Sequence, residues 1–358
     1  MFSLIMAGGM GIRFWPASRA SLPKQFLKVI GNRTLLQETV KRVSPLSRGE
    51  NMYVVVNQAH EMLARKQLAG HDTQILAEPL SRNTAGCIGL AALHMRRRDQ
   101  DMPIVILPAD HHIADDEKFR SSLLRAAELA KSGCIVTLGV TPTRPETGYG
   151  YIKTGAGRHP ATGEPVCAVE RFVEKPDLET AIDYLADESY VWNSGIFAAT
   201  AKTILAEIEC LLPDLYSRLE EIDQAIDTPE YESVLASVYP NLESISIDYG
   251  VMERSVTPMY VLKADFEWSD VGSWQSLYDL RSKSHDENGN LFHGDSIALE
   301  SKNNFLYSAG GRTISLLGVD DLIVVDTQDT VFVARIDRSQ DLRKMVSRLM
   351  DAGRADLC

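Results

Sequence analysis

LIMAGGMGIRFWP, residues 4 to 16, joins an apolar strand (residues 2–6) to a glycine-dense turn and then to a cation. The turn contains Gly8, Gly9 and Gly11. Arg13 follows directly, and Lys24 comes soon after in PKQF (residues 23–26). Glycines allow backbone N–H groups to crowd around an anion, and the two cations can hold phosphate oxygens. The segment therefore predicts a nucleoside triphosphate site at the end of a strand.

The two common phosphate-binding motifs do not fit these glycines. The chain has no G-x-x-x-x-G-K-[ST], so it is not a P-loop protein by this criterion. The spacing of the glycines is also not the G-x-G-x-x-G of dinucleotide-binding folds. Taken alone, the cluster fits a tight strand-to-helix turn equally well. Arg13, Lys24 and Gln25 behind it favour the phosphate interpretation.

Strands and helices alternate through the first 140 residues. Apolar runs predict strands at 2–6, 52–56, 104–107 and 135–140, and amphipathic spacing predicts helices at 35–43, 60–68, 83–97 and 119–131. Solidly apolar strands between helices imply an α/β fold with a mostly parallel sheet covered on both faces. Ligands of such sheets bind at the carboxyl ends of the strands. The glycine turn and Asp110 both follow strands, so we expect them to meet.

The tail has a different pattern. Between residues 288 and 335 the chain consists of short β-like pieces separated by Gly, Asn and Asp: DSIALES, NNFLYS, TISLLG, LIVVDT and TVFVARI. An amphipathic helix at 339–352 follows them. From pattern alone, a small antiparallel sandwich remains an alternative to a repetitive β-structure.

Composition narrows the class of protein. A chain of 358 residues accommodates one large domain and a smaller one. The net charge of −12 argues against nucleic acid and anionic membrane as partners. The five cysteines have no C-x-x-C spacing, and the apolar runs are shorter than a membrane span. These features predict reduced thiols and a cytoplasmic location.

The opening pattern A-G-G-x-G-x-R-x-W-P…P-K-Q-F resembles the signature of sugar-nucleotide pyrophosphorylases, in particular mannose-1-phosphate guanylyltransferases. Further motifs of that family follow in its order: EPLSRNTA (78–85), LPADHHI (107–113), ETGYGYI (146–152), FVEKP (172–176), WNSGIF (192–197), SIDYGVMER (246–254) and WSDVGSW (268–274). The resemblance covers the whole chain. One departure is Ile12, which stands where the family usually has Thr, so a hydroxyl contact to phosphate is missing there.

The resemblance implies a fold and an activity. The fold is a Rossmann-like (GT-A-type) mixed sheet between helices over residues 1–286, followed by a short left-handed β-helix and a helix over 287–358. The activity is transfer of GMP from GTP to α-D-mannose 1-phosphate, with pyrophosphate released. A homodimer is also expected from the resemblance.

The chemistry of this transfer calls for cations. The attacking sugar phosphate is already anionic at neutral pH, because a phosphate monoester has a second pKa of about 6. The protein must therefore offset charge repulsion and align two phosphates. Mg²⁺ suits this task and prefers carboxylate ligands. By the resemblance, these are Asp110 and Asp270. Asp110 could instead be a helix cap or a turn residue after its strand, and Asp270 could cap the helix that follows it. Neighbouring His111 and His112 lack the further ligands that a zinc site needs.

The resemblance assigns the remaining site residues. Arg13 and Lys24 would grip the triphosphate and, with Asp110, form the catalytic set. The nucleotide-binding set comprises Ala7, Gly8, Gly9, Gly11, Arg13, Lys24, Glu78, Arg82 and Asn83. The sugar-phosphate set comprises Gly148, Glu174, Lys175 and Asn193, and Gly195 would also allow backbone to approach the sugar. Surface charge for Arg13 and Lys24, a salt bridge for Glu174 and a helix cap for Asn83 are the competing roles.

Two other functions remain open at this point. The chain could act on another sugar 1-phosphate, such as a heptose 1-phosphate, or on another nucleotide. It could also be a non-catalytic regulator that binds a sugar nucleotide. Such regulators are expected to lose a key charged residue, whereas Arg13, Lys24, Asp110 and Asp270 are all present.

Overall fold

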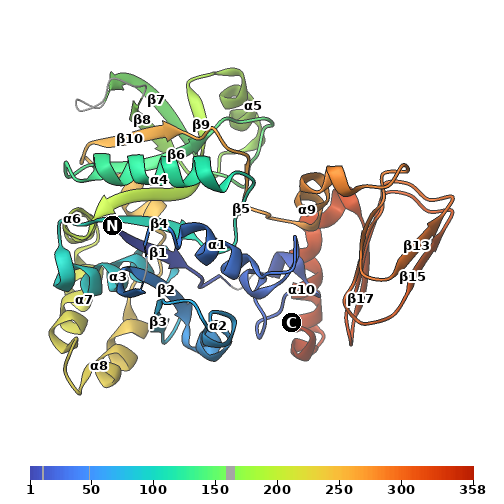
Figure 1. Ribbon diagram of the computed structural model, residues 1–358, viewed down its shortest axis with the longest axis horizontal. Helices are drawn as coiled ribbons and strands as arrows, with labels where there is room; N and C mark the ends of the chain where they lie inside the picture. The colour runs from blue at the N-terminus through green and yellow to red at the C-terminus, as the bar shows by residue number, and fades with distance from the viewer. Residues whose placement is uncertain (10–11, 48, 159–165) are drawn as a thin grey trace. The chain divides into compact units, whose positions relative to one another are not determined.

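The computed structural model (Figure 1) describes residues 1–9, 12–47, 49–158 and 166–358. Packing groups the chain into two units, each made of segments that are distant in sequence. Unit 1 comprises Met1–Gly8, Thr39–Ala109 and Ile113–Trp268. Unit 2 comprises Gly9–Glu38, Asp110–His112 and Ser269–Cys358. The domain boundary between residues 286 and 287 divides the chain differently and stays a prediction.

Unit 1 is built on a nine-stranded mixed sheet with the order β3-β2-β1-β4-β9-β6-β10-β8-β7. Its strands are β1 (Phe2–Met6), β2 (Met52–Asn57), β3 (Gln74–Glu78), β4 (Pro103–Pro108), β6 (Ile135–Val140), β7 (Tyr151–Arg158), β8 (Cys167–Val173), β9 (Tyr190–Thr200) and β10 (Met259–Lys263). β1 pairs in parallel with β2 and β4, whereas β9 runs antiparallel to β4 and β6. The sheet is therefore mixed, as expected: the pairings β3–β2, β2–β1, β1–β4 and β6–β10 are parallel, and the pairings made by β9, β8 and β7 are antiparallel.

Helices cover both faces of this sheet. Phe2 and Leu4 belong to one core with α3 (Asn83–Asp99), while Ile5 and Val105, which point the other way along their strands, are also fully buried. On that second face α4 (Asp116–Ala130) packs on β4, β6 and β9. Burial on both faces explains the unbroken apolar strands.

The other helical elements are shorter. The α-helices among them are α1 (Leu35–Val43), α2 (Glu61–Gln67), α5 (Leu178–Ala186), α6 (Ala201–Leu211), α7 (Pro213–Ala225), α8 (Tyr231–Val238), α9 (Trp274–Leu280) and α10 (Leu342–Asp351). The rest are the π-helix η6 (Asp248–Met252) and the 3₁₀ turns η1 (Ile12–Phe14), η2 (Lys24–Phe26), η3 (Gly49–Asn51), η4 (Gln58–His60), η5 (Tyr239–Asn241), η7 (Ser282–Ser284), η8 (Ile336–Asp341) and η9 (Ala355–Leu357). Two-residue strands are β5 (His112–Ile113) and β11 (Trp268–Ser269). Among the described residues, no helix combines the length and apolarity needed to cross a membrane.

Unit 2 contains a β-helix. Its strands are β12 (Leu291–His293), β13 (Ser296–Leu299), β14 (Phe305–Ser308), β15 (Ile314–Leu317), β16 (Leu322–Asp326) and β17 (Val331–Arg335). β12, β14 and β16 stack in parallel, as do β13 and β15, and β17 closes the stack antiparallel to β16. Parallel stacking of successive coils rules out the antiparallel sandwich; the left hand of the helix stays a prediction.

Polar side chains tie the coils together from inside. Asn304 is fully buried, and its amide nitrogen donates to the Asn290 side chain at 3.0 Å and to the Val319 carbonyl at 2.9 Å. Its amide oxygen accepts from the Leu322 N–H at 2.9 Å. Because buried polar groups must be paired, this ladder fixes the register of neighbouring coils.

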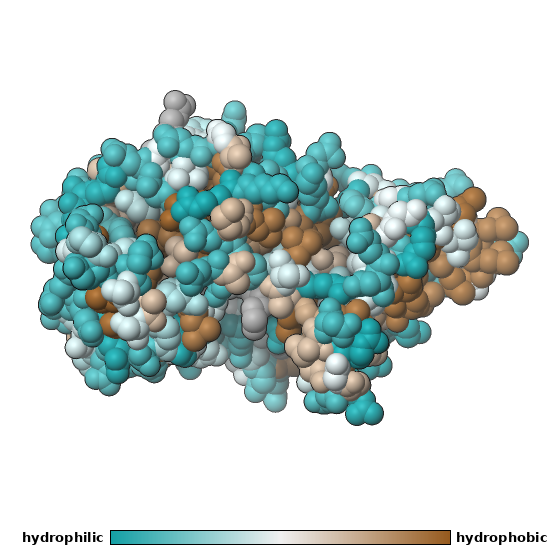
Figure 2. All heavy atoms as spheres, turned by 90° about the horizontal axis from the view of Figure 1, so that it is seen from below, coloured by the Kyte–Doolittle hydropathy of each residue, from teal (hydrophilic) through white to brown (hydrophobic). Residues whose placement is uncertain are grey.

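The outer surface of the β-helix is apolar in places. Ile297, Leu299 and Leu317 are each more than 60% exposed, and Ile297 and Leu299 alternate with inward-facing residues along β13. Figure 2 shows apolar surface gathered at the end where these strands lie. Such patches often mark interaction surfaces, but the homodimer stays a prediction.

Trp274 centres the core of unit 2. Its side chain is fully buried, its ring lies 4.8 Å from that of Phe14 and 5.6 Å from that of Phe305, and its indole N–H donates to the Trp15 carbonyl at 3.1 Å. The Trp15 indole in turn donates to the Leu357 carbonyl at 2.7 Å. One core thus packs the N-terminal segment, the WSDVGSW motif and the β-helix together.

Candidate active site

Lys24 organises the first group of site residues. Its side chain is only 6% exposed, and its ammonium lies 3.0 Å from Asp110 Oδ2 and donates to the Asp270 carbonyl at 2.5 Å. Lys24 lies on η2, whereas Asp110 and Asp270 lie just beyond β4 and β11. We call Arg13, Lys24, Asp110 and Asp270 the lysine–aspartate cluster. It brings four predicted residues together within unit 2.

The charge of Asp110 is stabilised by its surroundings. Burial alone would raise the pKa of this carboxyl, but attraction to Lys24 and His111 and the hydrogen bond from Lys24 outweigh it, so the pKa is lowered. Asp110 is consequently a carboxylate at neutral pH. A buried lysine facing a carboxylate also argues against the surface-charge alternative for Lys24.

Arg13 and Asp270 meet across a glycine. Arg13 Nη1 lies 3.8 Å from Asp270 Oδ2, and Arg13 is 43% exposed. A Cβ at Gly272 would lie 2.7 Å from Asp270 Oδ2 and 3.2 Å from Arg13 Nη1, so only glycine allows this approach. Between them Val271 holds a φ of +46°, which is strained for a β-branched residue. Gly272 and Val271 were not singled out from the sequence.

The helix-capping alternatives for both aspartates are wrong. The cap of α9 is Ser273, whose hydroxyl accepts from the Ser276 N–H at 3.1 Å. The cap of α4 is Asp115, which accepts from the N–H groups of Glu117 and Lys118. Neither Asp110 nor Asp270 is therefore committed to the end of one of these helices.

The donor set of this cluster fits a divalent cation that is shared with a substrate. No group of three or more His, Cys, Asp or Glu side chains suitable for a metal ion occurs within the described parts of the chain. Two carboxylates with phosphates and water are how Mg²⁺ is commonly bound. Asp110 and Asp270 could supply those two carboxylates.

The glycine turn is held by the PKQF segment. Gln25 donates from its side-chain nitrogen to the Gly9 carbonyl at 3.0 Å, and the Ala7 N–H donates to the Val55 carbonyl at 2.8 Å. The turn therefore follows directly after the end of β1, as predicted. Gly11 lies outside the described residues, and Ile12 begins η1.

Glu78 forms a second group with a residue that sequence analysis did not find. At the end of β3, Glu78 is 2% exposed, and the hydroxyl of Tyr239 donates to its Oε1. Burial raises the pKa of Glu78 to about 7, and the Tyr239 hydrogen bond limits the rise. A Cβ at Gly8 would lie 3.0 Å from Glu78 Oε2. Glu78 and Tyr239 are called the carboxylate–tyrosine pair below.

Arg82 and Asn83 follow in the same segment. The Arg82 guanidinium donates to the Pro240 carbonyl, next to Tyr239 in the chain. Asn83 begins α3 with a φ of +61°, and its side-chain oxygen accepts from the Thr84 N–H at 2.9 Å. Both residues therefore have structural partners, whatever else they bind.

The third group lies where three motifs converge in unit 1. Lys175 forms an ion pair with Glu174, whose side chain is 7% exposed. Asn193 donates from its side-chain nitrogen to Asp248 Oδ1 at 3.0 Å and accepts from the Gly195 N–H at 3.0 Å. We call Glu174, Lys175, Asn193 and Asp248 the acid–amide cluster.

Asp248 joins this cluster without having been predicted, although its motif SIDYGVMER was recognised. It begins the π-helix η6, an irregular turn of a kind frequent at functional sites. Burial raises the pKa of Asp248, while the Asn193 hydrogen bond and the Lys175 charge lower it in part. The positive charge of Lys175 therefore acts on Asp248 as well as on its ion-pair partner Glu174.

Gly150 makes the close contact in this cluster. A Cβ at Gly150 would lie 2.5 Å from Glu174 Oε2 and 3.3 Å from Asn193 Cβ. Gly148 instead donates its N–H to Glu146 Oε1 at 3.0 Å. Gly195 has a φ of +69°, a conformation that favours glycine.

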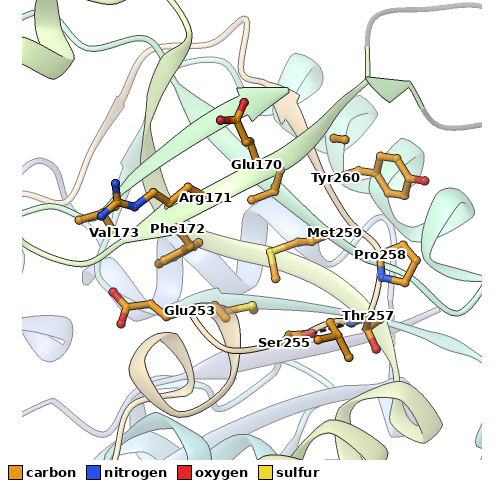
Figure 3. Close-up of a pocket in the computed structure, with 14 residues that line it drawn as sticks. Glu170, Arg171, Phe172, Val173, Glu253, Ser255, Thr257, Pro258, Met259 and Tyr260 are labelled. Atoms are coloured by element: carbon orange, nitrogen blue, oxygen red, sulfur yellow. Dashed lines mark hydrogen bonds between the residues drawn. The ribbon is translucent and has the colours of Figure 1, made fainter. Parts of the chain in front are cut away.

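A cavity of about 570 Å³ adjoins the acid–amide cluster (Figure 3). In Figure 3, Arg171 and Glu253 lie at one end and Pro258 and Tyr260 at the other. Glu253 connects it to the cluster, because its Oε1 accepts from the Glu174 N–H at 2.8 Å. Burial raises the pKa of Glu253, and the Arg171 charge opposes this.

Comparison with known proteins assigns the class. The nucleotidyl transferase family model matches residues 2–287, and the model described as a MannoseP isomerase/GMP-like beta-helix domain matches residues 294–349. With this fold and these sites, the protein is a nucleotidyltransferase enzyme.

Relatives narrow the family. The chain is 41% identical to the xanthan biosynthesis protein XanB of Xanthomonas campestris pv. campestris (strain B100), over 99% of this chain and 74% of that protein. It is 41% identical to a mannose-1-phosphate guanylyltransferase of Salmonella muenchen, over 98% of this chain and 73% of that protein. A crystal structure from Thermus thermophilus, described as a mannose-1-phosphate geranyltransferase, is 37% identical with a TM-score of 0.86, over 98% of this chain and 99% of that one. The chain belongs to the mannose-1-phosphate guanylyltransferase family of sugar nucleotidyltransferases.

Proposed function

We propose that this enzyme transfers GMP from GTP to α-D-mannose 1-phosphate, giving GDP-mannose and pyrophosphate. The observation that carries the proposal is the buried Lys24 ammonium, which lies 3.0 Å from Asp110 Oδ2 and bonds the Asp270 carbonyl. A fixed cation beside two acidic residues suits a reaction between two phosphates. Relatives named for this activity support the choice of substrates.

The residues of the lysine–aspartate cluster take separate roles in this proposal. Arg13 and Lys24 offset the charge on the triphosphate while a sugar-phosphate oxygen attacks the α-phosphorus in line. Asp110 and Asp270 would hold Mg²⁺, which when bound supplies charge neutralisation between the phosphates.

The other groups would select the two substrates. Glu78 is the candidate acceptor for guanine, and Lys175 the candidate partner of the sugar phosphate. Glu174 and Asn193 offer the carboxylate and amide that suit sugar hydroxyls. These roles agree with the burial of Glu78 and with the convergence of Glu174, Lys175 and Asn193.

The test is pyrophosphate release by the purified chain with Mg²⁺, using five nucleoside triphosphates against mannose, glucose and heptose 1-phosphates. Asp110→Asn is the variant, and Asp265→Asn, whose side chain is 66% exposed, is the matched control. We expect release with GTP and mannose 1-phosphate that is lost only in Asp110→Asn. Release with another pair would overturn the substrates, and full activity of Asp110→Asn would overturn the role of the cluster.

A further inference from the structure

Tyr239 is a buried tyrosine whose hydroxyl points at the carboxylate that we propose for base recognition. It is fully buried at the start of η5 and lies 161 positions from Glu78 in the chain, yet its hydroxyl donates to Glu78 Oε1. A buried tyrosine hydroxyl needs a partner, and here the partner is a side chain at a strand end that faces Gly8.

Two neighbouring residues, Gly86 and Arg82, favour the contact between the Tyr239 hydroxyl and Glu78. A Cβ at Gly86, on α3, would lie 3.3 Å from the Tyr239 oxygen, so glycine there allows the hydroxyl to approach. Arg82 donates to the carbonyl of Pro240 and thereby fixes the chain directly after Tyr239. The position of the Tyr239 hydroxyl is consequently set by Gly86 on α3 and by Arg82, which directly precedes α3.

The two oxygens of Glu78 have different neighbours. Oε1 accepts from Tyr239, whereas Oε2 faces Gly8, where a Cβ would lie at 3.0 Å. A hydrogen bond to one oxygen restrains the rotation of the carboxylate and so restricts the direction in which its second oxygen accepts. Guanine presents an N1–H and an N2 amino group to such an acceptor, whereas hypoxanthine lacks the amino group.

We infer that Tyr239 is a positioning residue for guanine selection: its hydroxyl holds Oε1 of Glu78 so that Oε2, beside Gly8, accepts from the guanine N–H donors. The inference rests on the proposed function, because it requires a guanine nucleotide as substrate. Tyr239 acts through Glu78 and has no direct part in the chemistry.

The protonation states of Glu78 and its neighbours support the same arrangement. The titratable groups that interact with Glu78 are Tyr239 on η5 and Cys87 on α3, and burial together with Glu78 raises the pKa of both well above its ordinary value. Both are thus neutral near pH 7. The pKa of Glu78 is about 7 with the hydroxyl in place, and loss of that hydrogen bond would raise it further. The carboxylate would then be mostly protonated at neutral pH and a poorer acceptor.

The experiment compares Tyr239→Phe with Tyr231→Phe in the full chain. Tyr231 is the matched control because its hydroxyl also bonds a side chain, His94 Nε2 at 2.9 Å, rather than Glu78. Steady-state rates with GTP and with ITP are measured between pH 6.5 and 9. For Tyr239→Phe at pH 7 we expect kcat/KM for GTP to fall about tenfold, mainly through KM, as for loss of one hydrogen bond to a charged group. The preference for GTP over ITP falls with it, and both recover as pH rises.

Gly86→Ala is the second variant, since its added methyl group presses on the Tyr239 oxygen without removing it. It is expected to lower the GTP-to-ITP preference in the same direction by a smaller factor. An unchanged preference in Tyr239→Phe and Gly86→Ala, or an equal fall in Tyr231→Phe, overturns the inference. A wild-type chain that does not use GTP overturns the proposed function and this inference together, whereas GTP use with an unchanged preference overturns the inference alone.

Discussion

Replacing Lys24 by Met keeps the aliphatic stem of the side chain and removes its charge. The ammonium makes two hydrogen bonds in the structure, to Asp110 Oδ2 and to the Asp270 carbonyl. Bonds to charged groups contribute about 1.5–3 kcal/mol each, but Asp110 is 34% exposed and water replaces part of its bond. We therefore expect Lys24→Met to lower the free energy of unfolding by about 2–3 kcal/mol at pH 7.

The pH dependence of this loss has a definite sign. The pKa of Asp110 is lowered in the folded chain, so its stabilising contribution is present above the unfolded value, 3.8, and is lost as pH falls through the folded value. Lys24→Met removes most of that contribution. The gap in stability between wild type and variant should consequently narrow below about pH 4.

Activity should fall further than stability. Loss of a preorganised group that stabilises charge in the transition state costs about 10²–10³ in kcat, so we expect pyrophosphate release to fall by that factor. Urea unfolding and steady-state rates are measured for Lys24→Met and for Lys28→Met, an exposed lysine in the same segment. A Lys24→Met rate within threefold of the Lys28→Met rate would refute the role given to the cluster.

Three further predictions concern other parts of the molecule. Glu78→Gln removes a carboxyl group whose pKa in the folded chain is about 7. Because this pKa lies above the unfolded value of 4.5, the wild type loses stability as pH rises from 4.5 to 7, and the free energy of unfolding measured in urea should shift in favour of the variant by about 3 kcal/mol over that range. A difference between variant and wild type that stays constant with pH would contradict this. Gly150→Ala places a methyl group 2.5 Å from Glu174 Oε2 and should raise KM for the sugar phosphate about tenfold, as for loss of one well-formed polar contact, with KM for GTP unchanged; Gly155→Ala, whose nearest neighbour is at 3.6 Å, is the control and should match wild type. Asn304→Ala removes three buried side-chain hydrogen bonds of the β-helix and should lower the free energy of unfolding by about 2–4 kcal/mol, whereas an unchanged urea midpoint would count against the ladder.

Periodic apolar spacing predicted the strands and helices of the first 140 residues closely. β1, α1 and β6 have the predicted bounds, and the other predicted elements differ by a few residues. β3 was not predicted, because its sequence QILAE is short and its residues are mostly half-buried at the edge of the sheet. Strands β7 to β10 were also not named: β9 and β10 pair with strands far away in sequence, and the register between the consecutive strands β7 and β8 is irregular.

The motifs identified most residues of the candidate site, but only some of the contacts among these residues were predicted. Asp110 follows the carboxyl end of β4, where the rule for parallel sheets places ligand-binding residues, whereas Lys24 lies on η2 and Asp270 follows the short strand β11, and both were predicted from their motifs. Tyr239 and Asp248 were missed for a different reason. Each reaches its partner through the helical layer or through an irregular turn, and spacing along the chain carries no signal for such contacts.

Unit 2 is made of three segments that leave the ribosome at different times, and the last of them determines when the nascent chain can become active. Lys24 leaves the ribosome 246 residues ahead of Asp270, which at about 5–20 residues per second is a delay of roughly 12–50 s. Gly9, Arg13 and Lys24 belong to a unit whose other two segments have not yet been translated at that point. The hydrogen-bond acceptors of Trp15 and Ala20, which are the carbonyls of Leu357 and Cys358, are translated later still. Translation of residues 269 to 358, rather than of the glycine turn itself, would therefore determine when the proposed phosphate site is complete.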